Sequence, residues 1–211
     1  MTDENVAGDV GTHATANCES PGAEQQPGRR RWSEVLVHRW PTALGVAVAA
    51  LTAFDLQVDA GFVSSLSALI VVMALVYFGA AALDRRRASW AALLAVLPLA
   101  LLIPEVATIS PSVILLVAAA VFLVVGVAHG QLRGPSGLTL QAAGVLAFGS
   151  TALAALLVAP ELGVYLVAFA LLGHAAWDAY HYLRDRVVAR SYAEFCGVLD
   201  LLVGGVILVM A

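Results

Sequence analysis

Residues 166–186 read LVAFALLGHAAWDAYHYLRDR. With the apolar residues before it, this stretch is long enough for a helix to cross the hydrocarbon core of a bilayer, which takes about 20 residues. Ionisable side chains inside such a segment are costly, and they mark a candidate functional site. His174, Asp178 and His181 are spaced at i, i+4 and i+7, so a helix places them on one face. The stretch therefore predicts a transmembrane helix with a polar stripe.

The composition of the whole chain indicates a membrane protein. Of its 211 residues, 61% are hydrophobic and only 12% are charged, whereas a soluble domain carries about 25% charged residues. All 11 basic residues are arginine. Because the chain has no lysine, it cannot form a Schiff base, which excludes a retinal-binding rhodopsin. The net charge of −4 gives no indication of a nucleic-acid surface. From the apolar composition we expect the lipid bilayer as a partner, with a small-molecule or ion substrate as a further possibility.

The apolar segments predict an all-α, polytopic fold with seven transmembrane helices. Residues 1–31 are polar and rich in small side chains, and they predict a disordered tail because they cannot bury enough apolar surface to fold. Residues 32–211 form the predicted transmembrane domain. Its helices are expected at 40–57, 61–83, 90–103, 110–129, 138–158, 162–183 and 192–211. The third is short and contains Pro98, which a transmembrane helix tolerates when its neighbours satisfy the freed carbonyl.

The connections between these segments predict an orientation. Every arginine falls in the tail or in alternate loops, and the remaining loops carry Asp59, Glu105 and Glu161 instead. The arginines are Arg29, Arg30, Arg31 and Arg39 before the first helix, Arg85, Arg86 and Arg87 after the second, Arg133 after the fourth, and Arg184, Arg186 and Arg190 after the sixth. The positive-inside rule then predicts a cytoplasmic N-terminus and an outside C-terminus. High alanine content without lysine suggests a GC-rich bacterial genome, and hence a multi-pass protein of the plasma membrane.

The last two predicted helices bring their polar residues to one depth. Tyr192, Cys196 and Asp200 form a second stripe at i, i+4 and i+8. The connection between the helices is short, so they run antiparallel and adjacent. Counting outward from the turn places His181 level with Cys196, and it places Asp200 between Asp178 and His174. If both stripes face inward, they meet in the cytoplasmic half of the hairpin.

Three interpretations of His174, Asp178, His181 and Asp200 remain open at this stage. The side chains can pair with one another and fix the packing of the helices. They can hold a metal ion, since imidazole and carboxylate suit zinc or iron. They can relay protons or ions, because histidine titrates near neutral pH. His129 at the end of the fourth helix is either a further ligand or an interfacial residue, and the second is commoner for a lone histidine there. Tyr192 and Cys196 are possible accessory residues.

The predicted topology, with a late histidine–aspartate cluster, resembles that of alkaline ceramidases and adiponectin-type receptors. The resemblance implies an intramembrane zinc site and hydrolysis of a lipid. It covers topology and the cluster rather than a motif, because those families have two histidines four residues apart in the last helix. Here His174 and His181 are seven apart in the sixth helix, so no residue roles are transferred.

Three functions are compatible with the sequence. The leading one is a small transporter or ion/proton-coupled permease that uses the His/Asp cluster. The second is an intramembrane metal-dependent hydrolase acting on lipid, and the third is a membrane subunit or scaffold without chemistry of its own. The sequence contains no nucleotide-binding motif and no Ser-His-Asp signature.

Overall fold

The computed structural model describes residues 39–54, 59–107, 111–133 and 137–210, and for 101–107 it describes the backbone only. Within these residues the chain forms seven α-helices, one short 3₁₀ helix and no strand. The helices are α2 (Trp40–Phe54), α3 (Ala60–Leu83), α4 (Ala88–Ala107), α5 (Pro111–Ala128), η1 (Gln131–Arg133), α6 (Leu138–Leu157), α7 (Pro160–Arg184) and α8 (Arg190–Met210). The predicted disordered tail at 1–31 lies outside the described residues.

The prediction of an all-helical chain is confirmed, and each predicted segment corresponds to one α-helix. Five of them, α3, α5, α6, α7 and α8, are long and apolar enough to cross a membrane, while α2 and the first part of α4 (Ala88–Ala100) are shorter apolar helices. The largest difference from the predicted bounds is in α4, expected at 90–103. It extends beyond both ends and continues through Pro98. The lengths and composition indicate a membrane-embedded protein.

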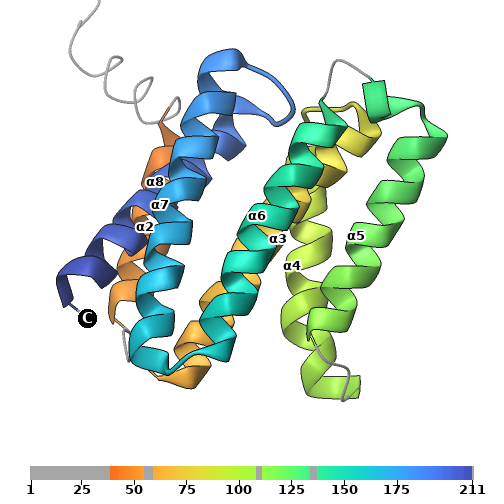
Figure 1. Cartoon of the computed structure of the whole chain (residues 1–211). Helices are drawn as coiled ribbons and strands as arrows, with labels where there is room; N and C mark the ends of the chain where they lie inside the picture. The colour runs from red at the N-terminus through yellow and green to blue at the C-terminus, as the bar shows by residue number, and fades with distance from the viewer. Residues whose placement is uncertain (1–38, 55–58, 108–110, 134–136, 211) are drawn as a thin grey trace, which may run out of the picture. The chain divides into compact units, whose positions relative to one another are not determined.

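In the compact unit formed by residues 37–211, helix α3 lies at the centre of the bundle. It packs against α4, α5, α6 and α7, and Figure 1 shows it between α6 and α4. Its second half ends in a run of small residues, of which Ala80, Ala81 and Ala82 are at most 1% exposed. Small side chains let helix backbones approach closely, which is how helices associate where no hydrophobic effect drives them together.

Helices α7 and α8 form a tight hairpin, and α2 packs along α8. Helix α7 ends at Asp185, which has a left-handed backbone (φ 49°) and donates its N–H to the carbonyls of His181 and Tyr182. At the start of α8, Glu194 accepts a hydrogen bond from Thr42 of α2. Arg39 Nη1 lies 3.4 Å from the same carboxylate. These contacts fasten the N-terminal end of α2 to the N-terminal end of α8.

The outward faces of the helices are strongly apolar. Leu116 and Val124 on α5 are 69% and 67% exposed, and Leu146 on α6 is 73% exposed. Phe169 on α7 is 62% exposed. Large apolar patches of this kind are rare on soluble monomers. They suit a surface that faces hydrocarbon, in agreement with the membrane assignment.

Candidate functional site

The polar stripe of α7 faces the interior of the bundle. His174 and Asp178 are fully buried, and His181 is 2% exposed. The 3.6-residue period of the helix explains why all three share a face, while other positions of α7, such as Phe169 and Leu183, point outward. Burial of ionisable groups requires partners, because an isolated buried charge is far costlier than a paired one.

Asp200 of α8 joins His174 and Asp178 in one group. His174 Nδ1 lies 2.9 Å from Asp200 Oδ2 and 3.1 Å from Asp178 Oδ2. Asp200 is also fully buried, so the site places two carboxylates against a single imidazole nitrogen. The sequence spacing predicted that these residues lie at one depth, and in the structure three of the four expected residues lie together. We call His174, Asp178 and Asp200 the buried triad.

A glycine allows α8 to approach α7 at the triad. A Cβ atom added at Gly197 would lie 3.2 Å from Asp178 Cβ and 3.9 Å from the carbonyl oxygen of Ala175. Contacts of 3.2 Å are closer than ordinary van der Waals packing. The missing side chain at this position therefore helps to set the short distances within the triad.

Tyr77, on the central helix α3, is a site residue that the sequence reasoning missed. Its hydroxyl donates a hydrogen bond of 2.5 Å to Asp178 Oδ1, and its ring centroid lies 5.7 Å from that of His174. Both oxygens of Asp178 therefore have partners. The available signal was a tyrosine in the interior of an apolar helix, where a buried hydroxyl needs a hydrogen-bond partner.

His181 belongs to a neighbouring pair rather than to the triad. Its Nδ1 lies 2.9 Å from the carbonyl oxygen of Trp177, which can only accept, so Nδ1 carries the proton. Its Nε2 lies 3.0 Å from Gln141 Nε2 of α6, and in the neutral ring it accepts from that amide. Gln141 was also missed, although an amide in an apolar segment is a comparable signal. The ring of Tyr77, 4.8 Å from that of His181, lies beside the pair.

Two polar atoms of the triad lack a hydrogen-bond partner among the described residues: His174 Nε2 and Asp200 Oδ1. The triad contains two carboxylates for one imidazole. If both carboxylates are ionised and His174 is protonated, the group still carries one net negative charge in a fully buried position. Such a charge is strongly unfavourable unless another cation or proton neutralises it. The arrangement is therefore suited to taking up one positive charge.

The triad also has the composition of a metal site. One ligand atom from each of His174, Asp178 and Asp200 lies within 4.8 Å of the others. Imidazole and carboxylate are the ligands that zinc and non-haem iron commonly use. The three residues could thus hold zinc or iron, whereas His181 is already engaged by Gln141 and Trp177.

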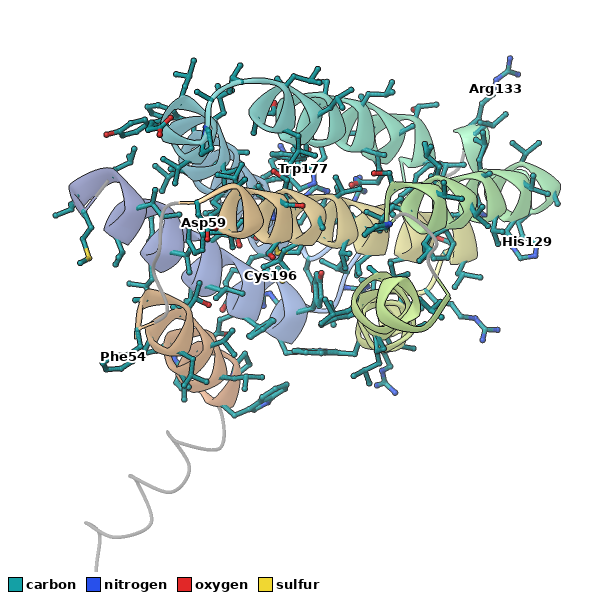
Figure 2. All side chains as sticks on the ribbon, turned by 90° about the horizontal axis from the view of Figure 1, so that it is seen from below. Phe54, Asp59, His129, Arg133, Trp177 and Cys196 are labelled. Atoms are coloured by element: carbon teal, nitrogen blue, oxygen red, sulfur yellow. The ribbon has the colours of Figure 1, made fainter. Side chains whose placement is uncertain are left out.

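The predicted accessory residues divide into two groups. Tyr192 and Cys196 are buried on α8, on the same side as Asp200. His129 follows α5 and is exposed. Figure 2 shows it projecting away from Trp177 and Cys196, so it is not brought to the triad. The interfacial interpretation of His129 stays a prediction.

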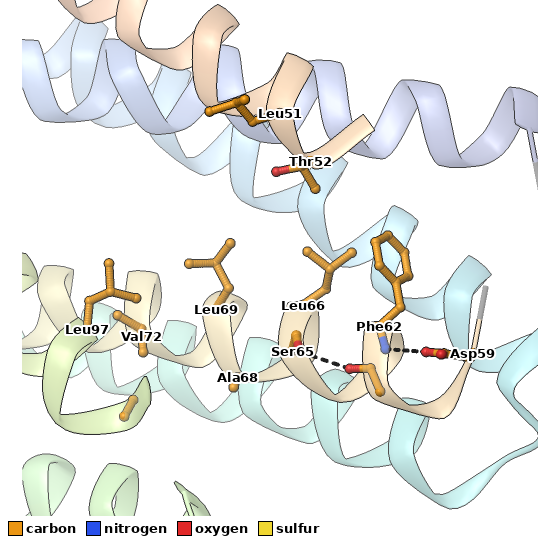
Figure 3. Close-up of a pocket in the computed structure, with 12 residues that line it drawn as sticks. Leu51, Thr52, Asp59, Phe62, Ser65, Leu66, Ala68, Leu69, Val72 and Leu97 are labelled. Carbon is orange, nitrogen blue, oxygen red and sulfur yellow. Dashed lines mark hydrogen bonds between the residues drawn. The ribbon is translucent and has the colours of Figure 1, made fainter. Parts of the chain in front are cut away.

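A cavity of about 670 Å³ lies between α2, α3 and α4, at the end of the bundle that contains Asp59. Figure 3 shows Leu51 and Thr52 of α2 opposite Phe62, Leu66 and Leu69 of α3. The Asp59 carboxylate accepts a hydrogen bond of 2.7 Å from the Phe62 N–H and so caps α3. The lining does not include the triad, but it reaches Val72 on α3.

No protein-family model, curated protein or solved structure matches this chain.

Proposed function

We propose that this protein is a small transporter or permease coupled to protons or ions, and that the buried triad binds the coupling cation. His174, Asp178 and Asp200 form the binding group, and His181 is a neighbouring polar residue. The observation that carries the proposal is the convergence of two fully buried carboxylates on one imidazole nitrogen, at 2.9 and 3.1 Å. Pairing with the histidine for helix packing would need only one carboxylate, and the second supports a role in binding a proton or cation.

The hydrogen bonds around the triad support a route for a proton. They connect Tyr77, Asp178, His174 and Asp200 in that order. A proton bound by Asp200 at Oδ1, which has no partner among the described residues, neutralises one carboxylate. Its release restores the charge. The bound and free states differ by one charge in a medium of low dielectric constant, so each state favours a different environment around the triad.

The cavity beside α2 supports access from one side of the membrane. It reaches Val72, five residues before Tyr77 on the same helix, which is about 7.5 Å along the axis at 1.5 Å per residue. In the proposed orientation, with all seven helices crossing and the arginine-rich loops in the cytoplasm, the cavity opens toward the outside. The triad residues themselves do not line this cavity.

Proton flux into proteoliposomes tests this function. Vesicles containing the full chain and an internal pH-sensitive dye are given a membrane potential, first alone and then with a panel of amino acids, organic acids, amines and metal salts. We expect proton entry above that of empty vesicles with wild type and with Glu161→Gln, an exposed residue of α7. Asp200→Asn should reduce it to the level of empty vesicles. Wild-type flux equal to that of empty vesicles throughout, or unchanged flux in Asp200→Asn, would contradict the proposal.

An intramembrane metal-dependent hydrolase is the second candidate, and the ligand spacing within 4.8 Å favours it. Elemental analysis of detergent-purified protein separates it from the first. About one zinc or iron per chain in wild type, lost in His174→Ala and Asp178→Ala, would make the hydrolase primary and direct assays to lipid substrates. Absence of metal from folded wild type would set this candidate aside.

A further inference from the structure

A second cavity lies at the opposite end of α3 from Asp59, where the turns after α3 and α7 meet. Its volume is about 450 Å³. The charged side chains that line it are Asp84, Arg85, Arg86, Arg184, Asp185 and Arg186. Four arginines against two aspartates give the lining a formal charge of +2. The residues come from two turns about 100 positions apart in the chain, so the cavity exists only in the folded protein.

The two aspartates neutralise only part of the positive charge of the arginines. Arg86 Nη1 lies 2.7 Å from Asp185 Oδ2 and donates a hydrogen bond to the Asp185 carbonyl. The Arg86 guanidinium therefore holds the pKa of Asp185 below its ordinary value. Arg190 also approaches the same carboxylate, at 3.9 Å. Asp185 is thus paired with Arg86 from the turn after α3 and with Arg190 at the start of α8.

Arg85, Arg184 and Arg186 form no ion pair with any described residue. All three are exposed, and Arg184 stacks over the ring of Tyr180 at 5.4 Å. Each guanidinium carries five N–H donors in a fork that matches the oxygens of a phosphate group. The cavity thus gathers donors that the protein itself does not use.

The helix ends do not need these arginines as caps. The backbone N–H groups of Asp84 and Arg85 bond to carbonyls at the end of α3, and those of Asp185 and Arg186 do the same for α7. Both aspartates adopt the left-handed conformation with φ of 49°, which commonly ends a helix. The carbonyls that arginine could have capped are therefore already satisfied at these positions.

Hydrogen bonds between the first turn of α4 and the segment around the start of α8 hold the walls of the cavity in place. Trp90 Nε1 donates to Ser191 Oγ at 3.0 Å, and the Ala189 N–H donates to Ser89 Oγ at 3.3 Å. Ser89 is fully buried. The cavity is consequently preformed, and a ligand would not have to order the turns when it binds.

We propose that this cavity binds the phosphate group of an anionic ligand. Basic pockets between transmembrane helices on the cytoplasmic side suit the head groups of anionic lipids, and the arginine-rich end of this bundle is the proposed cytoplasmic end. A phospholipid head group and a free phosphate ion offer the same chemistry to Arg85, Arg184 and Arg186. Separate titrations with a phospholipid and with inorganic phosphate distinguish these two sources.

Binding is measured with the full-length protein in detergent. One arm titrates inorganic phosphate, and the other titrates short-chain phosphatidylglycerol with phosphatidylcholine as the zwitterionic comparison; thermal stability and native mass spectrometry are the readouts. Arg85→Gln/Arg184→Gln removes two guanidinium groups from the cavity. Arg87→Gln/Arg133→Gln removes two exposed arginines that do not line it, and so serves as the charge-matched control.

We expect phosphatidylglycerol or phosphate to bind wild type and the control with similar affinity, and the cavity variant about tenfold or more weakly, as lost guanidinium contacts predict. Response to phosphatidylglycerol alone identifies a lipid site, and response to both ligands identifies the phosphate group itself as the determinant. Binding of neither ligand to wild type, or equal weakening in both double variants, would overturn the proposal. The second result would mean that overall surface charge acts instead of the cavity.

Discussion

Asp178 is the residue on which the candidate site depends most. It accepts hydrogen bonds from Tyr77 and His174, and so connects α3 to α7, while His174 makes the contact with Asp200 of α8. The association of His174 with Asp178 and Asp200 could be predicted from sequence, because helical spacing and a short turn determine their relative depth. The contribution of Tyr77 could not. It lies 101 residues from Asp178, and an isolated tyrosine in an apolar helix does not indicate which helix it faces.

The hydroxyl of Tyr77 should contribute measurably to stability. Tyr77→Phe leaves Asp178 Oδ1 buried without its donor, and a buried polar atom that loses its partner costs about 1–3 kcal/mol. We expect a lower midpoint of thermal unfolding in detergent for this variant. Tyr165→Phe, at a position on α7 that is 36% exposed, should change the midpoint little. Equal midpoints for Tyr77→Phe and wild type would show that this hydrogen bond is not made.

At the scale of elements, the α7–α8 hairpin holds the triad together. Its turn places Val187 in a left-handed conformation with φ of 71°, which is strained for a β-branched residue. The ends of α3 and α7 share a left-handed aspartate and the same pattern of N–H bonds to the last turn. Neither feature was predicted, because the sequence has no glycine at these positions to signal a left-handed residue.

The close approach of α8 to α7 predicts that an added methyl group lowers the stability of the protein at Gly197 but not at Gly205. Gly197→Ala places a Cβ 3.2 Å from Asp178 Cβ, and overpacking of this kind costs about 1–3 kcal/mol. Gly205→Ala, in the same helix, meets no atom within 4 Å and should be tolerated. Thermal unfolding of the two variants side by side measures the difference. Equal destabilisation would mean that loss of glycine in α8, rather than contact with Asp178, is responsible.

At the scale of the whole molecule, the positions of the helices could be predicted but their arrangement could not. Hydropathy identifies the segments because every backbone polar group in a bilayer must be satisfied within a helix. Helices that are apolar on all sides give no face to distinguish lipid from protein. The central place of α3, and the exposure of α5, in which only Leu115 and Gly126 are buried, therefore emerge only from the structure.

The arginine distribution predicts that Arg133 and Glu161, at opposite ends of α6 and both exposed, lie on opposite sides of the membrane. Cysteines introduced at these positions, in a Cys18→Ser background that keeps only the buried Cys196, can be labelled with a maleimide that does not cross membranes. We expect Glu161→Cys to react in intact cells and Arg133→Cys to react only after permeabilisation. Reaction of both in intact cells, or the reverse pattern, would refute the seven-helix orientation.

The binding and release of a proton by the buried triad can be measured by infrared difference spectroscopy of the full-length protein across a pH titration. Because the chain has 15 acidic side chains, the informative signal is the difference between variants. We predict a pH-dependent component of the carboxylic-acid band that is present in wild type and in Glu161→Gln and is absent from Asp200→Asn. Identical pH-dependent carboxyl bands in wild type and Asp200→Asn would contradict the proposed proton binding at the triad.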